Sequence, residues 1–64
     1  MNLSDADHAL LRLYAKDQLI NNLGYAVLSF DVDTWTQLVD ANSHELYKEV
    51  TPERMEKVRA RYNG

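Results

Sequence analysis

Residues 10–30, with the sequence LLRLYAKDQLINNLGYAVLSF, form the densest apolar stretch of the chain and decide its fold. Upstream of this stretch, Ser4 is a good helix N-cap, and Asp5 and Asp7 place acids in the first turn, where they complement the helix dipole. From there to Gly24 no residue breaks a helix, and β-branched residues are nearly absent. The sequence therefore predicts one long N-terminal helix, with Gly24 placed as its left-handed C-terminal cap.

Apolar side chains occupy two faces of this predicted helix. One face carries Ala6, Ala9, Leu10, Leu13, Ile20 and Leu23. Leu11, Ala15 and Leu19 form a second stripe, at the spacing i, i+4, i+8, on roughly the opposite side. A helix over a small monomeric core needs one apolar face only. The second stripe is therefore expected to be covered either by the C-terminal part of the same chain or by another molecule.

The rest of the apolar stretch, YAVLSF at residues 25–30, is short and bounded by Gly24 and Asp31. This pattern suits a buried strand or a buried helical turn. A single strand in so short a chain has no strand to pair with, so we favour a helical or irregular connection.

Three shorter helices are predicted after this connection, at residues 33–41, 44–50 and 52–62. Asp31 or Asp33 caps the first, and Asn42-Ser43 marks a break before the second. Thr51, followed by proline at the first helical position, marks the start of the third.

The predicted fold is all-α: a small single-domain helical bundle spanning residues 1–64, with one long N-terminal helix followed by two or three short helices. The expected core consists of Leu10, Leu13, Ile20, Leu23, Val27, Leu28, Phe30, Trp35, Leu38, Leu46, Val58 and Tyr62.

Length and composition limit what such a bundle can do. A chain of 64 residues without cysteine forms no disulfide and no thiolate zinc site, and its core is small. The N-terminus lacks a basic leader followed by an apolar run, and the longest mostly apolar run, residues 23–30, is far shorter than the roughly 20 residues of a membrane span. These features predict a cytoplasmic protein that does not interact with membranes.

A local motif, AVLSFDVDTW, resembles the first motif of haloacid-dehalogenase-type phosphotransferases. That resemblance implies Asp31 as a nucleophile and Asp33 as an acid/base. It ends after about ten residues, and the family's larger domain and its later lysine and aspartate motifs do not fit in this chain. An EF-hand loop starting at Asp31 also fails, because Thr36 and Asn42 occupy the positions of its glycine and glutamate.

His8 and His44 are the only histidines, and neither has the convergent ligands that a metal site requires. The sequence therefore predicts a protein that is not an enzyme, with no catalytic residue, no metal and no cofactor.

Charge separates the chain into an acidic body and a basic end. Residues 1–50 carry eight acidic against three basic residues, and residues 51–64 carry four basic against two acidic residues. Arg54, Lys57 and Arg61 share one face of the last helix, which gives an alternative function as a small nucleic-acid-binding regulator. Glutamates in the neighbouring segment 44–50 and the acidic net charge of −3 disfavour this alternative.

The favoured interpretation is a small interaction module that binds a partner protein and modulates, in most such cases inhibits, its activity. Phages and other mobile elements encode many proteins of this kind, although this comparison is an analogy of size and composition. The expected partner is another protein with a basic surface, or a second copy of the chain. The residues expected to bind it are Leu11, Ala15, Leu19, Asp31, Asp33 and Asp40.

Overall fold

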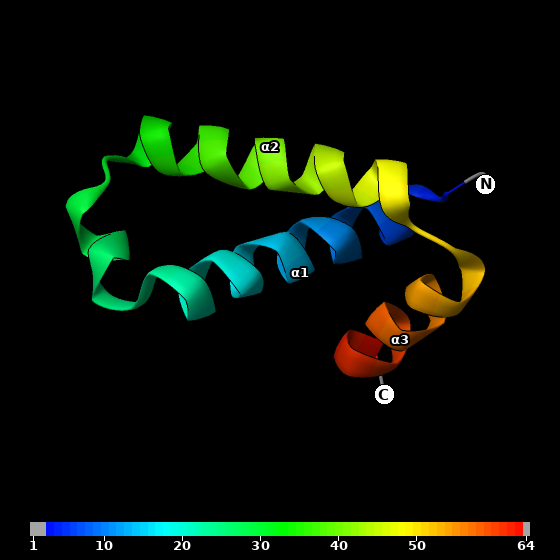
Figure 1. Cartoon of the computed structure of the whole chain (residues 1–64). Helices are drawn as coiled ribbons and strands as arrows, with labels where there is room; N and C mark the ends of the chain where they lie inside the picture. The colour runs from blue at the N-terminus through cyan, green and yellow to red at the C-terminus, as the bar shows by residue number, and fades with distance from the viewer. Residues whose placement is uncertain (1–2, 64) are drawn as a thin grey trace.

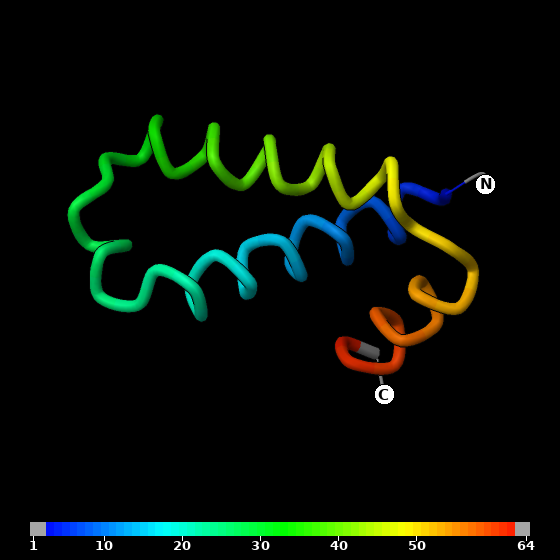
Figure 2. The backbone as a smooth tube through the Cα atoms, viewed as in Figure 1, coloured from blue at the N-terminus to red at the C-terminus, as the bar shows by residue number. Residues whose placement is uncertain are grey.

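The computed structural model describes residues 3–63, which form three α-helices and one short 3-10 helix (Figure 1). The elements are α1 (Asp5–Leu23), η1 (Gly24–Ser29), α2 (Val32–Glu49) and α3 (Pro52–Asn63). Helices α1 and α2 form an antiparallel hairpin that η1 closes at one end, and α3 folds back beside the first half of α1 at the other end (Figure 2). The all-α prediction is confirmed.

Side-chain caps start the helices where the sequence predicts them. Ser4 and Asp7 form a reciprocal capping box, in which the Asp7 amide donates to Ser4 Oγ at 3.1 Å and the Ser4 amide donates to Asp7 Oδ2 at 3.4 Å. At the start of α2, the Thr34 amide donates to Asp31 Oδ1 at 2.7 Å. Thr51 Oγ1 accepts a hydrogen bond of 3.2 Å from the third residue of α3. These caps satisfy backbone donors that have no partner within the helix.

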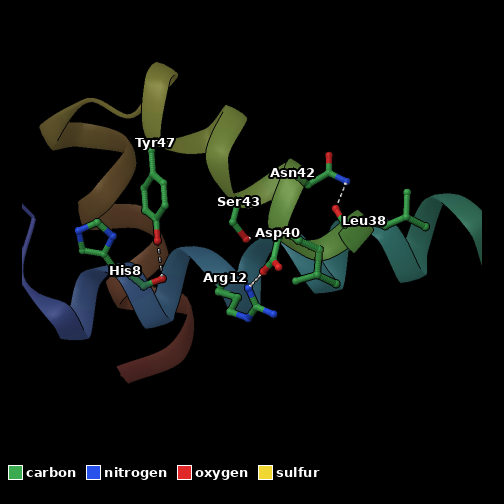
Figure 3. A network of polar contacts seen from close by, with 8 residues as sticks. His8, Arg12, Leu38, Asp40, Asn42, Ser43 and Tyr47 are labelled. Carbon is green, nitrogen blue, oxygen red and sulfur yellow. Dashed lines mark hydrogen bonds and ion pairs between the residues drawn. The ribbon is translucent and has the colours of Figure 1, made fainter. Parts of the chain in front are cut away.

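Helix α2 is continuous, so the predicted break at Asn42 and Ser43 is wrong. Both side chains donate to the carbonyl four residues earlier: Asn42 Nδ2 to Leu38 O at 3.1 Å (Figure 3), and Ser43 Oγ to Val39 O at 2.7 Å. Their polar groups are therefore satisfied inside the helix and do not compete with its backbone hydrogen bonds. Ser43 is buried, and its small side chain helps α2 to approach α1.

The buried core lies where α3 meets α1. Leu11, Met55 and Val58 form its centre, and Leu46, Tyr47, Val50 and other half-buried side chains pack around it. Burial of Leu11 and Met55, the largest fully enclosed side chains, supplies much of the free energy that holds α3 in place.

The predicted core is only partly correct. Val58 is buried as expected, but Leu13, Ile20 and Leu28 are exposed, so these three predictions are wrong. The other predicted core residues are half-buried. The sequence-based core missed four buried hydrophobic residues: Leu11, Ala15, Val39 and Met55. The face of α1 that is buried is thus nearly opposite to the expected one, because α2 and α3 together cover the stripe of Leu11, Ala15 and Leu19.

An ion pair fixes the middle of α3 to the first turn of α1. Arg59 donates in a bidentate manner to Asp7, from Nε to Oδ1 at 2.9 Å and from Nη2 to Oδ2 at 2.8 Å. The hydrogen bonds from Arg59 lower the pKa of Asp7 from 3.8 to about 2, and the bonds with Ser4 add to this effect. Asp7 thus both caps α1 and binds α3, a second role that its position in the first turn did not predict.

A second polar contact fixes the end of α3. The Tyr62 hydroxyl donates to Asp17 Oδ2, nearly three turns further along α1 than Asp7. Desolvation raises the pKa of Tyr62 to about 12, and its hydrogen bond to Asp17 contributes in the same direction. Helix α3 is therefore held to α1 by an ion pair near its middle, a hydrogen bond near its end and the apolar cluster between them.

Gly24 turns the chain from α1 into η1 with a backbone that side chains of L-amino acids rarely adopt, at φ 57° and ψ −132°. A Cβ built at this position would meet nothing within 4 Å, so any cost of substitution is a backbone cost. We expect Gly24→Ala to lower the free energy of unfolding by about 1–3 kcal/mol.

D-alanine at position 24, introduced by chemical synthesis, is the matched control, because the mirror-image residue favours positive φ. We expect it to be neutral or stabilising by about 0.4–1 kcal/mol. Urea unfolding of the three proteins measures the difference. Equal stability of the L-alanine and D-alanine proteins would contradict the assigned backbone.

Candidate functional site

The predicted partner-binding stripe on α1 is largely inside the molecule. Leu11 is 2% exposed and Ala15 is 0% exposed, and Leu19 is half-buried. The prediction that Leu11 and Ala15 face a partner is therefore wrong. The alternative that the sequence left open, coverage by the C-terminal part of the same chain, applies to Leu11, which packs in the cluster with Met55 and Val58.

The three acids assigned to the same surface lie on α2 and at its start, and they are not equivalent. Asp31 is exposed and caps α2, and the hydrogen bonds from Thr34 lower its pKa. Asp33 is exposed in the first turn of α2. Asp40 lies further along the helix and forms an ion pair with Arg12 across the α1–α2 interface (Figure 3). Asp31 and Asp33 are thus presented together at the hairpin end, whereas Asp40 already has a partner within the chain.

The most exposed large apolar side chains belong to the same segment as Asp31 and Asp33. Tyr25 is 93% exposed, Leu28 83% and Val32 78%, and all three lie in η1 or at the first residue of α2. We call this set, Tyr25, Leu28 and Val32 with Asp31 and Asp33, the tip surface. It forms the closed end of the hairpin, opposite α3 (Figure 1). Leu28 was predicted to lie in the core, because the mostly apolar segment 25–30 suits a buried element, and its exposure contradicts that prediction.

The electrostatic surroundings of the tip surface are acidic. From position 17 to position 47 the chain contains five acidic residues and no lysine or arginine. Hence no cation within this segment offsets the charges of Asp31 and Asp33. An acidic surface is therefore disfavoured as an occupant of the tip surface, since like charges brought together on binding cost several kcal/mol.

A groove of about 610 Å³ lies at the other end of the molecule, between α1, the end of α2 and α3. Its apolar lining includes Leu11, Leu46, Val50 and Val58, and its charged lining consists of Arg54, Lys57 and Arg61 with a single carboxylate, Glu49. Arg54 lies 3.9 Å from Glu49, and the Arg61 guanidinium lies 5.7 Å from the centre of the Tyr14 ring. We call this feature the basic groove.

The three cations that the sequence assigned to nucleic-acid contact thus line one groove. Their grouping follows from the helical spacing that sequence analysis identified, and the apolar lining from α1 and α2 is the part it did not foresee. Contact of Arg54, Lys57 and Arg61 with nucleic acid stays a prediction.

A second hollow, of about 370 Å³, lies on the hairpin between α1 and α2. Trp35 and Leu13 contribute to its lining, together with Arg12 and Lys16. Trp35 is half-buried here, so the single tryptophan packs against the hairpin and takes no part in the α3 cluster.

The two histidines differ in their surroundings. The His8 ring packs on Tyr47 with 4.5 Å between ring centres, and the Tyr47 hydroxyl donates to the His8 carbonyl at 3.4 Å (Figure 3). His44 is exposed on α2. Within residues 3–63, no three histidine, cysteine, aspartate or glutamate side chains lie close enough to hold a metal ion together.

None of the helices in the described part of the chain has both the length and the apolar character that crossing a bilayer requires. No protein-family model matches the chain, and comparison with curated proteins and with solved structures gives no match.

Proposed function

We propose that this protein is a non-enzymatic interaction module that docks through its tip surface on a basic, apolar surface of a partner protein and inhibits that partner. A cytoplasmic location belongs to the same proposal. The observation that carries it is the exposure of Tyr25, Leu28 and Val32, which are between 78% and 93% accessible in a chain with very few buried hydrophobic residues.

The position of these side chains supports a binding role. Large apolar residues gathered on a surface are typical of sites where proteins meet, whereas single exposed residues are common and carry no such meaning. Here η1 and the first turn of α2 hold them in regular structure between two packed helices. Such a surface loses little conformational entropy when it is covered, which favours affinity.

Charge supports the choice of partner. Asp31 and Asp33 lie beside the apolar side chains in the sequence, and the segment from 17 to 47 has no lysine or arginine. Charge complementarity of this kind raises the rate of association and selects against acidic partners. The proposal therefore predicts binding that weakens as salt concentration rises.

Site-specific photocrosslinking tests the proposal. A benzophenone amino acid replaces Tyr25 in one protein and the exposed His44, about three turns of α2 beyond Asp33, in the control. In the native cytoplasm we expect a discrete adduct from position 25 and none from position 44. We also expect Leu28→Ser to abolish the adduct.

The captured protein is then purified and titrated directly. We expect Leu28→Ser to raise Kd about ten-fold or more, as for a buried anchor of an interface. Asp31→Ser keeps a helix cap while removing the charge. A higher Kd and a weaker salt dependence for this variant would show that the Asp31 charge contributes to the binding free energy. Equal Kd values for the wild-type protein and Leu28→Ser, or binding that strengthens with salt, would refute the proposed docking. The partner's activity, measured with and without the protein, tests inhibition.

A further inference from the structure

The basic groove and the tip surface have opposite charge, and apolar side chains contribute to both. The groove presents Arg54, Lys57 and Arg61 against one carboxylate, beside apolar side chains from all three α-helices. The tip surface presents two carboxylates beside three exposed apolar side chains. The basic groove thus has the positive charge and the apolar side chains that the proposed function expects in a partner of the tip surface.

Within one molecule these two surfaces do not meet. The protein measures 35 × 20 × 17 Å, and the tip surface lies at the closed end of the hairpin while α3 lies at the other end (Figures 1 and 2). Helix α3 is also fixed against α1 by the Asp7–Arg59 pair and by the Tyr62–Asp17 hydrogen bond. Contact between the two surfaces therefore requires two copies of the chain.

Charge also selects among the ways in which two copies can meet. A symmetric contact between two tip surfaces places four carboxylates, Asp31 and Asp33 of each copy, in one interface without a cation from residues 17–47. Such juxtaposition of like charges is strongly unfavourable. A contact between the tip of one copy and the groove of another pairs acids with Arg54, Lys57 and Arg61 instead.

We propose that the basic groove is the docking site for the tip surface of a second copy of this chain. The proposal rests on the proposed function in that it uses the same tip surface, and it names one occupant for that surface. The contact is heterologous, because different patches of the two copies meet. Lys57 is the groove cation best placed to meet an incoming carboxylate, because Arg54 already lies near Glu49 and Arg61 lies over Tyr14.

Self-docking has a consequence for regulation. A tip surface seated in another copy's groove is closed to any other partner, so the assembled form is the inactive form of the interaction module. Dilution, or a partner that binds the tip surface more tightly, releases it. A small domain with a limited core also gains stability from such assembly.

Sedimentation velocity from micromolar to millimolar protein tests the proposal. We expect the wild-type mass to rise above that of the monomer with concentration, and less so at high salt. Leu28→Ser in the tip and Lys57→Glu in the groove should each weaken association about ten-fold or more. Lys48→Glu is the matched control, because it makes the same charge change at an exposed position outside the groove, and it should weaken association less than Lys57→Glu does.

Mixing two defective variants gives the sharpest result. The Leu28→Ser protein keeps an intact groove, and the Lys57→Glu protein keeps an intact tip surface. An equimolar mixture should therefore form a one-to-one complex at concentrations where each variant alone is monomeric. Circular dichroism confirms that both variants are folded. A wild-type protein that stays monomeric at millimolar concentration, or a mixture that remains two monomers, would overturn the proposal.

These results separate the two proposals. If the chain is monomeric throughout but position 25 still crosslinks to a basic partner, self-docking fails and the proposed function stands. If the variants complement each other but the tip surface captures no other protein, self-docking stands and the proposed function fails.

Discussion

Leu11→Ala is expected to leave the protein largely unfolded at room temperature. Leu11 lies at the centre of the cluster with Met55 and Val58, where it joins α1 to α3. Truncation of a buried leucine to alanine costs about 2–5 kcal/mol. A single core in a domain of this size rarely supplies more than about 3–5 kcal/mol in total. Urea titration followed by far-UV circular dichroism measures the loss.

Leu13→Ala is the matched control for this prediction. It makes the same chemical change two residues away on the same helix, at a side chain that is 41% exposed. We expect it to cost about 1 kcal/mol or less, because much of the side chain already contacts water. The alternative orientation of α1, with Leu13 in the core and Leu11 toward a partner, predicts the reverse order. A greater loss for Leu13→Ala would therefore contradict the fold described here.

The second large effect is expected for Asp7→Asn. The asparagine removes the charge that Arg59 binds through two hydrogen bonds, and Arg59 then remains beside a neutral partner. We expect a clear fall in Tm at pH 7, larger than for Asp5→Asn, which changes an exposed aspartate in the same turn. The Asp7 side chain is only 10% exposed, although that of Arg59 is 41% exposed, and loss of a mostly buried, hydrogen-bonded carboxylate costs more than loss of a surface charge.

The pH dependence of this effect has a definite sign. The pKa of Asp7 falls from 3.8 to about 2 in the folded protein, so the unfolded chain takes up a proton on this group first as pH falls. Its contribution to stability is therefore complete above pH 3.8 and is lost as pH falls toward 2. The difference in Tm between the wild-type protein and Asp7→Asn should narrow over this range. A difference that is the same at pH 7 and pH 2 would refute the assigned role of the ion pair.

Local signals in the sequence predicted the starts of the helices well. Ser4, Asp31 and Thr51 each accept a backbone hydrogen bond at the helix start where the sequence placed them, and Gly24 adopts the positive φ expected of it. Each of these features depends on residues within three positions of the cap, so the local sequence alone identifies the interacting groups. The break predicted at Asn42 failed because that residue found a second local partner, the Leu38 carbonyl.

The orientation of α1 could not be predicted in this way. One face of the helix has more and larger apolar residues than the stripe of Leu11, Ala15 and Leu19, and hydrophobicity alone therefore favoured the wrong face as the core. The deciding contacts come from α3, more than 40 residues away, through Met55 and Val58. Similarly, Leu28 is apolar but exposed. It lies in η1, which crosses the end of the hairpin, and no element within the described part of the chain covers it there.

The candidate site was recognised in part for the same reason. Asp31 and Asp33 were identified from local sequence, and both lie in the tip surface. The helical spacing of Arg54, Lys57 and Arg61 predicted a common face, and all three line the basic groove. Leu46 and Val50 complete that groove only because α2 and α3 both pack against α1, which no local pattern reveals.

The absence of lysine and arginine from positions 17 to 47 also determines how this protein can be studied. Trypsin cleaves after Lys16 and next after Lys48, so the entire tip surface is recovered in a single long peptide, and any covalent adduct on it changes the mass of that one fragment. Amine-reactive dyes and surface-coupling reagents attach at Lys16, Lys48, Lys57 or the N-terminus. Immobilisation by standard amine chemistry therefore leaves residues 17–47, and with them the tip surface, unmodified.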